Sequence, residues 1–113
     1  MINKIMNQIP FQSRVFQKNS EYLDENQKEQ FSKAFDTLKN NGVNDEVYFT
    51  FNIVDEVPRS VDITVKKSGV NRWGQPLVGN NFLLMNNLTN QDILDSYKFA
   101  GKDIYSYKRK RTY

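Results

Sequence analysis

A change in the spacing of hydrophobic residues, from a helical period to strict alternation, limits this chain to folds that combine helices with a sheet. Residues 24–41 place Phe31, Phe35 and Leu38 on one helix face. Asn-Asn-Gly at residues 40–42 is a stop signal, and beyond it the period falls to two, as in a strand with one buried face. Helices and strands do not alternate further along the chain, so we expect an α+β fold.

Two alternating runs, residues 46–54 and 61–66, flank a short polar turn at residues 55–58 and predict an antiparallel hairpin. One side of this hairpin is hydrophobic and should face the helix. Asp24 and Gln27 form a capping-box pattern that marks where the helix begins. The expected core joins the apolar faces of helix and hairpin: Phe31, Phe35, Leu38, Phe49, Phe51, Ile53, Ile63 and Val65.

The remaining elements should complete a small antiparallel sheet. A third strand is predicted at residues 77–85, where Gly79 indicates a bulge or a close approach of another element. A short second helix is expected at residues 90–98, with Gly101 as its stop signal. A last strand is expected at residues 104–108. The expected architecture is a three- to four-stranded antiparallel sheet with helices packed on one face.

The expected single domain, residues 1–113, begins with an amphipathic segment at residues 1–20 that contains no acidic residue. Its first apolar residues lie at helical spacing, and Pro10 should end a short helix near residue 8. A secretion signal is excluded because Asn and Gln interrupt the apolar run, and a transit peptide would be richer in Arg and Ser. We therefore expect this helix to dock on the domain.

Composition excludes several classes of function. The 113 residues include no Cys and no His, which excludes a disulfide framework, a thiolate zinc site and the most common general base. The carboxylates are scattered over expected caps, turns and helix faces, so we expect no enzyme, no cofactor and no metal site. No apolar run reaches the roughly 18–20 residues of a membrane span, so we expect a cytoplasmic protein that does not bind membranes.

Positive charge is concentrated at the C-terminus. Residues 98–113 hold six basic residues and one acidic residue, whereas the whole chain has a net charge of +3. Cations displace counterions from phosphates and aromatic rings stack on bases, so the basic tail at residues 108–113 predicts contact with DNA or RNA. A solvated tail, or one that docks on an acidic protein, is the alternative. The candidate residues are Tyr105, Tyr107, Lys108, Arg109, Lys110 and Arg111.

A second candidate site is the loop at residues 66–74. It contains the single Trp of the chain, Trp73, directly after Arg72. A Trp at the tip of a hairpin is a frequent anchor for a binding partner, and an Arg can bind phosphate or carboxylate. The alternative is that Trp73 folds back and covers the edge of the core. Lys66 and Lys67 belong to the same candidate site.

Two functional hypotheses fit these features. The first is a small nucleic-acid-binding accessory protein, and the second is an inhibitor or adaptor that binds a host or defence protein. Asn occurs 14 times and Ala twice, which suggests an AT-rich genome such as that of a low-GC bacterium, a phage or a plasmid. The central α-β-β-β-α order of elements resembles that of double-stranded-RNA-binding domains. The resemblance is limited to this order, because the second helix begins Asn-Gln-Asp, which repels phosphate. Neither hypothesis fixes the oligomeric state.

Overall fold

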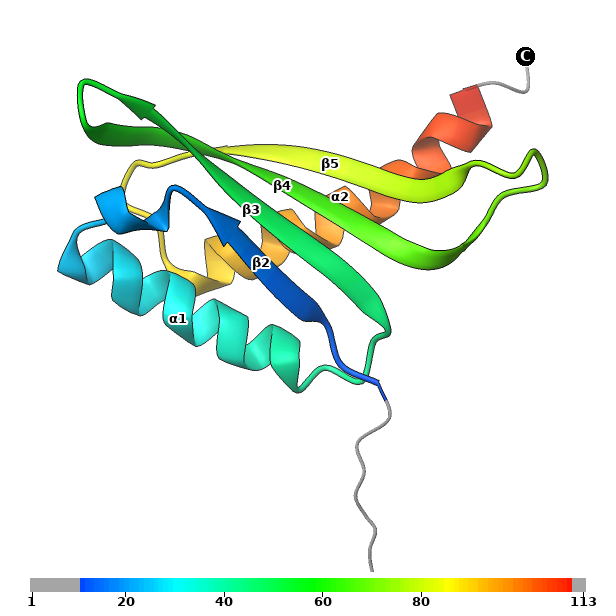
Figure 1. Ribbon diagram of the computed structural model, residues 1–113, viewed down its shortest axis with the longest axis horizontal. Coiled ribbons are helices and arrows are strands. Elements are labelled where there is room, and N and C mark those ends of the chain that lie inside the picture. Colours follow the sequence, from blue (N-terminus) through cyan, green and yellow to red (C-terminus); the bar gives the residue numbers. More distant parts are fainter. Residues whose placement is uncertain (1–10, 111–113) are drawn as a thin grey trace, which may run out of the picture.

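The computed structural model describes residues 11–110, with the backbone alone for residues 105–110. Four strands form one sheet, and both helices contribute to the core on one side of it (Figure 1). In chain order the elements are β2 (Arg14–Lys18), the 3-10 helix η1 (Ser20–Tyr22), α1 (Glu25–Lys39), β3 (Asp45–Val54), β4 (Val57–Val70), β5 (Pro76–Leu84) and α2 (Asn90–Lys110). The predicted α+β class is confirmed. The helix expected before residue 8 lies outside the described residues.

The sheet is mixed, with the strand order β2-β3-β4-β5. β3, β4 and β5 are antiparallel to their neighbours, whereas β2 pairs with β3 in parallel. The prediction of a purely antiparallel sheet is therefore wrong at this edge. The cause is α1, which returns the chain to the end where β2 begins. β2 had no clear sequence signal because Val15 alone among its residues packs against the core.

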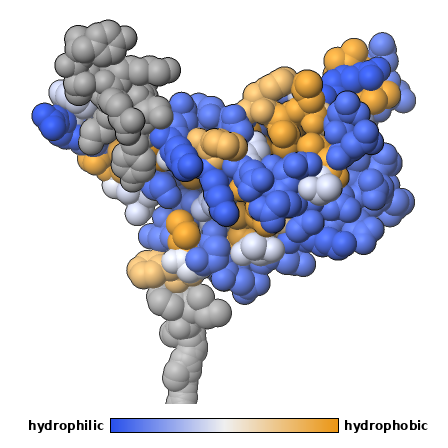
Figure 2. Space-filling model, turned by 180° about the vertical axis from the view of Figure 1, so that it is seen from behind, coloured by the Kyte–Doolittle hydropathy of each residue, from blue (hydrophilic) through white to orange (hydrophobic). Residues whose placement is uncertain are grey.

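Local sequence signals place α1 correctly. The carboxylate of Asp24 accepts a hydrogen bond from the backbone N–H of Gln27 at 2.7 Å, and Gln27 Oε1 accepts one from the backbone N–H of Asp24 at 2.9 Å. The predicted capping box is thus confirmed. Gly42, just beyond the helix, has a φ of 73°, a conformation that favours glycine. The polar side of α1 faces outward, and the rear of the molecule is mostly hydrophilic with hydrophobic side chains in separate patches (Figure 2).

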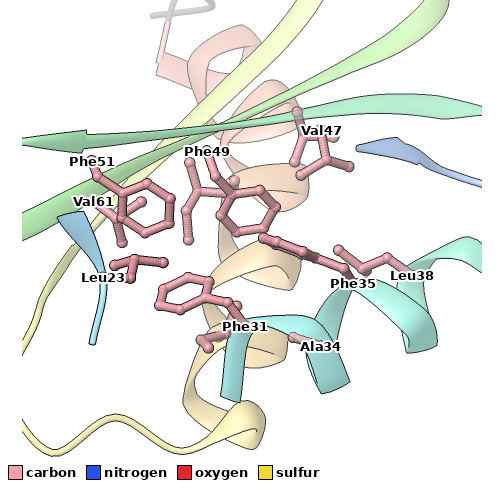
Figure 3. Close-up of a cluster of buried hydrophobic side chains, with 13 residues drawn as sticks. Leu23, Phe31, Ala34, Phe35, Leu38, Val47, Phe49, Phe51 and Val61 are labelled. Atoms are coloured by element: carbon pink, nitrogen blue, oxygen red, sulfur yellow. The ribbon is translucent and has the colours of Figure 1, made fainter. Parts of the chain in front are cut away.

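The core lies between the sheet and the helices, and its centre is aromatic (Figure 3). The ring centroids of Phe31 and Phe51 are 5.0 Å apart in an edge-to-face arrangement, and those of Phe35 and Phe49 are 4.8 Å apart. Seven of the eight predicted core residues are buried. The eighth, Ile53, is half-buried because the β3–β4 register shifts beside it, close to the turn.

α2 differs most from its prediction. It continues through Gly101 to Lys110, so the strand expected at residues 104–108 is wrong, and the first three residues of the expected basic tail belong to this helix. Ile93, Ala100 and Ile104 are buried at helical spacing against the sheet. Their burial outweighs the weak helix propensity of one glycine.

Gly79 on β5 explains how α2 lies so close to the sheet. A Cβ atom at this position would lie 2.0 Å from the carbonyl oxygen of Ala100 and 2.9 Å from Cγ1 of Ile104. A side chain of any size would force the helix away from the strand. The predicted close approach at Gly79 is confirmed, and its partner is α2.

Candidate functional site

The β4–β5 turn has a defined structure that one side chain stabilises. Asn71 Oδ1 accepts hydrogen bonds from the backbone N–H groups of Trp73 and Gln75, at 2.8 and 3.0 Å. Asn71 Nδ2 donates to Gln75 Oε1 at 2.9 Å. Gly74 has a φ of 78°, which the turn requires and a glycine adopts without strain. The turn therefore presents Arg72 and Trp73 at one end of the sheet in a fixed backbone conformation.

Trp73 lies on the surface, with 54% of its area exposed. The guanidinium carbon of Arg72 is 5.4 Å from the centroid of the Trp73 ring, which is within the range of a cation–π contact. Trp73 is not among the residues of the hydrophobic core. Trp73 therefore belongs to the surface of the turn rather than to the buried core.

Lys66 and Lys67, predicted as one site, point to opposite faces of the sheet. Lys66 is exposed and pairs in the sheet with Glu46 and Val78 on the face that the helices leave open. Lys67 Nζ lies 4.0 Å from Oδ2 of the buried Asp45, on the helix side. Only Lys66 is therefore available on the open side, whereas Lys67 balances a buried negative charge.

The C-terminal half of α2 adjoins the β4–β5 turn. A hollow of about 310 Å³ lies between them, lined by Asn71 and Gln75 of the turn, by β5, and by Asp103 and Ile104 of α2. Asp103 Oδ2 accepts a hydrogen bond from the backbone N–H of Asn80 at 3.1 Å, which holds the helix to the edge strand. In Figure 1 the turn and the C-terminal end of α2 project from the same end of the molecule.

The predicted C-terminal residues are partly described. Tyr105, Tyr107, Lys108, Arg109 and Lys110 form the last turns of α2, by their backbone. Arg111 lies outside the described residues. The structure thus brings two separately predicted sites, the Trp73 turn and the basic C-terminal segment, to one end of the molecule.

A buried polar cluster at the start of β3 was not predicted. Asp45 is 1% exposed, and both its carboxylate oxygens have partners: the Ser13 hydroxyl donates to Oδ1, and the Tyr97 hydroxyl donates to Oδ2 at 2.8 Å. Asn41 Nδ2 donates to Ser13 Oγ at 2.8 Å. Burial, and then the hydrogen bond to Asp45, raise the pKa of Tyr97 to about 12. The cluster joins the start of β2, the end of α1, β3 and α2, which indicates a structural role.

The outer side of the sheet is a second surface with aromatic side chains, and we call it the open face. The rings of Phe16 and Tyr48 stack on it, with centroids 5.0 Å apart and an interplanar angle of 18°. Phe82 is 55% exposed on the same face. Phe16 and Phe82 were not predicted, because β2 carries no clear strand pattern and because both faces of β5 carry apolar residues. The open face consists of Arg14, Phe16, Lys18, Glu46, Tyr48, Thr50, Asn52, Ser60, Asp62, Thr64, Lys66, Val78, Asn80, Phe82 and Leu84.

Residues 11–110 contain no group of three or more His, Cys, Asp or Glu residues placed to hold a metal ion. Within the same residues, neither helix combines the length and the apolar content that crossing a bilayer requires. Comparison of the chain with protein-family models, curated proteins and solved structures found no match.

Proposed function

We propose that this chain is a small non-enzymatic nucleic-acid-binding accessory protein that contacts its ligand at the end formed by the β4–β5 turn and the C-terminal half of α2. One observation carries the proposal. The turn that presents Arg72 and Trp73 lines the same hollow as Asp103 and Ile104 of α2, just before the run of four cations at residues 108–111.

The chemistry of this end suits a polyphosphate. Cations that contact phosphates release condensed counterions, which favours binding at low salt. An exposed indole ring supplies a flat surface for a base, and an Arg beside it can bind a phosphate oxygen. Asp103 is the one acidic residue among residues 98–113, and its carboxylate accepts a hydrogen bond from the backbone N–H of Asn80. The turn with Arg72 and Trp73 and the backbone at the C-terminal end of α2 lie at the same end of the molecule (Figure 1).

A protein partner is the second candidate, and the outer row of β5 favours it. Val78, Phe82 and Leu84 are exposed by 39%, 55% and 62% on the open face. Apolar side chains grouped on one strand are typical of protein interfaces. An inhibitor or adaptor of a host or defence protein would use this row, and its binding would depend little on salt.

Replacing Trp73 by Ala tests the proposed site. We expect binding to a fluorescently labelled oligonucleotide to weaken by about 2 kcal/mol, because one stacking surface is lost. The melting temperature should change little, since Trp73 is outside the core. Fluorescence anisotropy and thermal unfolding measure the two effects.

Tyr22→Ala is the matched control, because Tyr22 is an exposed aromatic residue on η1, away from the β4–β5 turn (Figure 1). This variant should bind as tightly as the unmodified chain. Equal affinities for the Trp73→Ala and Tyr22→Ala variants would remove Trp73 from the site.

A further inference from the structure

The two edges of the sheet differ in how far they are covered. At the β5 edge, the backbone N–H of Asn80 donates to Asp103 Oδ2 at 3.1 Å, and α2 packs directly on Gly79. At the β2 edge, four of the five residues are exposed, and within residues 11–110 no strand other than β3 pairs with β2. An uncovered edge offers backbone N–H and C=O groups to a further strand. β2 is therefore the edge at which this sheet can be extended.

Beside this edge lies a hollow of about 310 Å³ between the β2–η1 segment and α1, and we call it the edge groove. Its floor is apolar and consists of Leu23, Phe31 and Phe35. Gln17 lines it from β2, and Ser32 lines it from α1, the helix next to β2 in Figure 1. Successive side chains of a strand point to opposite faces. A strand added to β2 would therefore place every second side chain over the edge groove.

The exposed cations of β2 decide what kind of strand this edge accepts. Arg14, which also contacts Glu46 at 3.3 Å, and Lys18 lie on the open face of β2. If a second copy of this chain paired antiparallel along all five residues of β2, Arg14 of each copy would lie opposite Lys18 of the other. Like charges directly opposite each other destabilise a sheet, whereas opposite charges stabilise it. The edge therefore disfavours a second copy and favours acidic side chains at alternate positions.

The rim of the edge groove has the same sign of charge. Its lining includes Lys28 and Lys39, with Asp36 as the single carboxylate. Lys28 Nζ lies 3.8 Å from Oε2 of Glu25, whose side chain is 95% exposed, and such a surface pair is weak. Lys39 forms no ion pair within residues 11–110. An acidic strand is therefore attracted from α1 as well as from β2.

We propose that the edge of β2 and the edge groove bind an extended peptide segment of another protein, in which apolar and acidic side chains alternate. The segment adds a strand to the sheet and places its apolar side chains over Leu23, Phe31 and Phe35. Its acidic side chains point toward Arg14 and Lys18. In such strand addition, backbone hydrogen bonds supply affinity and the alternating side chains supply specificity. The proposal concerns the sheet edge opposite β5, so it goes beyond the proposed function and does not depend on nucleic-acid binding.

Peptide binding to the full chain, measured by fluorescence anisotropy, tests this proposal. The probe is a labelled peptide of sequence Glu-Val-Glu-Leu-Glu-Val-Glu. Its control has the same composition in the order Glu-Glu-Val-Leu-Val-Glu-Glu, which breaks the alternation. We expect the alternating peptide to bind about 10-fold or more tightly than the control, because only alternation sends apolar and acidic side chains to different faces. Equal affinities, or no binding of the alternating peptide, would overturn the proposal.

Methylation of the peptide nitrogens shows whether the peptide binds as a strand. One version is methylated at the N–H groups of its apolar residues, and another at those of its acidic residues. The N–H groups of alternate residues point to the same edge of a strand, so one set faces β2 and the other faces solvent. We expect one version to bind about 10-fold or more weakly, since its hydrogen bonds to β2 are lost, and the other to bind unchanged. Equal effects of the two methylations would contradict pairing with β2.

Ser32→Tyr tests the edge groove from the side of the protein. Ser32 is exposed on α1 and lines the groove, so a large side chain there fills it and should weaken binding of the alternating peptide by about 10-fold. Thr37→Tyr is the matched control, because Thr37 is also exposed on α1 but does not line the groove. This control should bind as the unmodified chain does, and thermal unfolding verifies that both variants fold.

Two results with these variants would overturn the proposal. The first is equal affinity of the Ser32→Tyr and Thr37→Tyr variants for the alternating peptide, which would remove the edge groove from the site. The second comes from light scattering: if the unmodified chain is a dimer that Ser32→Tyr dissociates, the edge of β2 binds a second copy instead of a peptide.

Discussion

At the scale of single residues, the buried carboxylate of Asp45 has the clearest energetic consequence. A buried charge is costly unless hydrogen bonds and an opposite charge compensate it. Here Ser13 and Tyr97 donate to the two oxygens, and Lys67 lies 4.0 Å from one of them. Removing one donor leaves the charge under-compensated, so these contacts couple four segments of the chain.

Tyr97 makes the stability of this cluster dependent on alkaline pH. Its pKa is raised from the usual 10 to about 12 because burial and the contact with Asp45 disfavour the phenolate. The folded state thus favours the protonated phenol, and this stabilisation is fully present below pH 10 and lost as the pH rises through 12. We expect a loss of about 1 kcal/mol, since the ring is only half-buried.

Urea unfolding between pH 8 and pH 12, measured for the unmodified chain and for Tyr97→Phe, isolates this contribution. Because the other titrating groups are shared, the difference in unfolding free energy between the two proteins should shrink across this range. A difference that is constant with pH would contradict the coupling of Tyr97 to Asp45.

Phe51 tests the centre of the core. It is fully buried against Phe31, so Phe51→Ala should lower the free energy of unfolding by about 3–5 kcal/mol through lost transfer energy and a residual cavity. The Phe99→Ala change, at a residue 58% exposed, should cost less than about 1 kcal/mol. Chemical denaturation of both variants provides the comparison, and similar costs would contradict the register of β3.

At the scale of elements, a helix or strand was predicted well where the residues that define it are close together in the sequence. α1 was predicted well because its cap, its apolar face and its stop signal all lie in the helix or within three residues of its ends. β2 was missed because pairing with β3, rather than its own pattern, defines it. α2 was predicted too short because Gly101 is a local stop signal, whereas Ala100 and Ile104 pack on β5 and extend the helix. The errors at β2 and at α2 both arose from tertiary contacts, which the sequence does not show.

A pair of glycine substitutions tests the packing of α2 on β5. Gly79→Ala places a Cβ atom 2.0 Å from the carbonyl oxygen of Ala100, so it should destabilise the fold by about 1–3 kcal/mol. Gly101→Ala meets no atom within 4 Å in the middle of the helix and should stabilise it by up to about 1 kcal/mol. Thermal unfolding of the two variants shows whether each substitution lowers or raises the stability of the fold. Destabilisation by Gly101→Ala would mean that the helix ends at this residue after all.

At the scale of the whole molecule, the candidate binding groups lie on two surfaces that share little sequence. Arg72, Trp73 and the C-terminal basic segment were predicted as separate sites, and their shared end of the molecule emerged only from the packing of α2 along β5. Phe16 and Phe82 of the open face were not predicted, since their positions depend on strand pairing. Sequence patterns therefore identified the residue types of the first surface, and the fold was needed for its arrangement and for the whole of the second.

The dependence of duplex DNA binding on salt tests whether the C-terminal end of α2 contacts phosphates. Neutralising Lys108, Arg109, Lys110 and Arg111 with Gln should reduce the magnitude of d log K/d log[salt] by up to about three to four, at about 0.9 for each lost phosphate contact. The control neutralises four exposed cations elsewhere, Lys28, Lys33, Lys39 and Arg59, and should leave the slope unchanged. A flat salt dependence in the unmodified protein, or equal slopes for the two variants, would contradict nucleic-acid binding at the C-terminal end of α2.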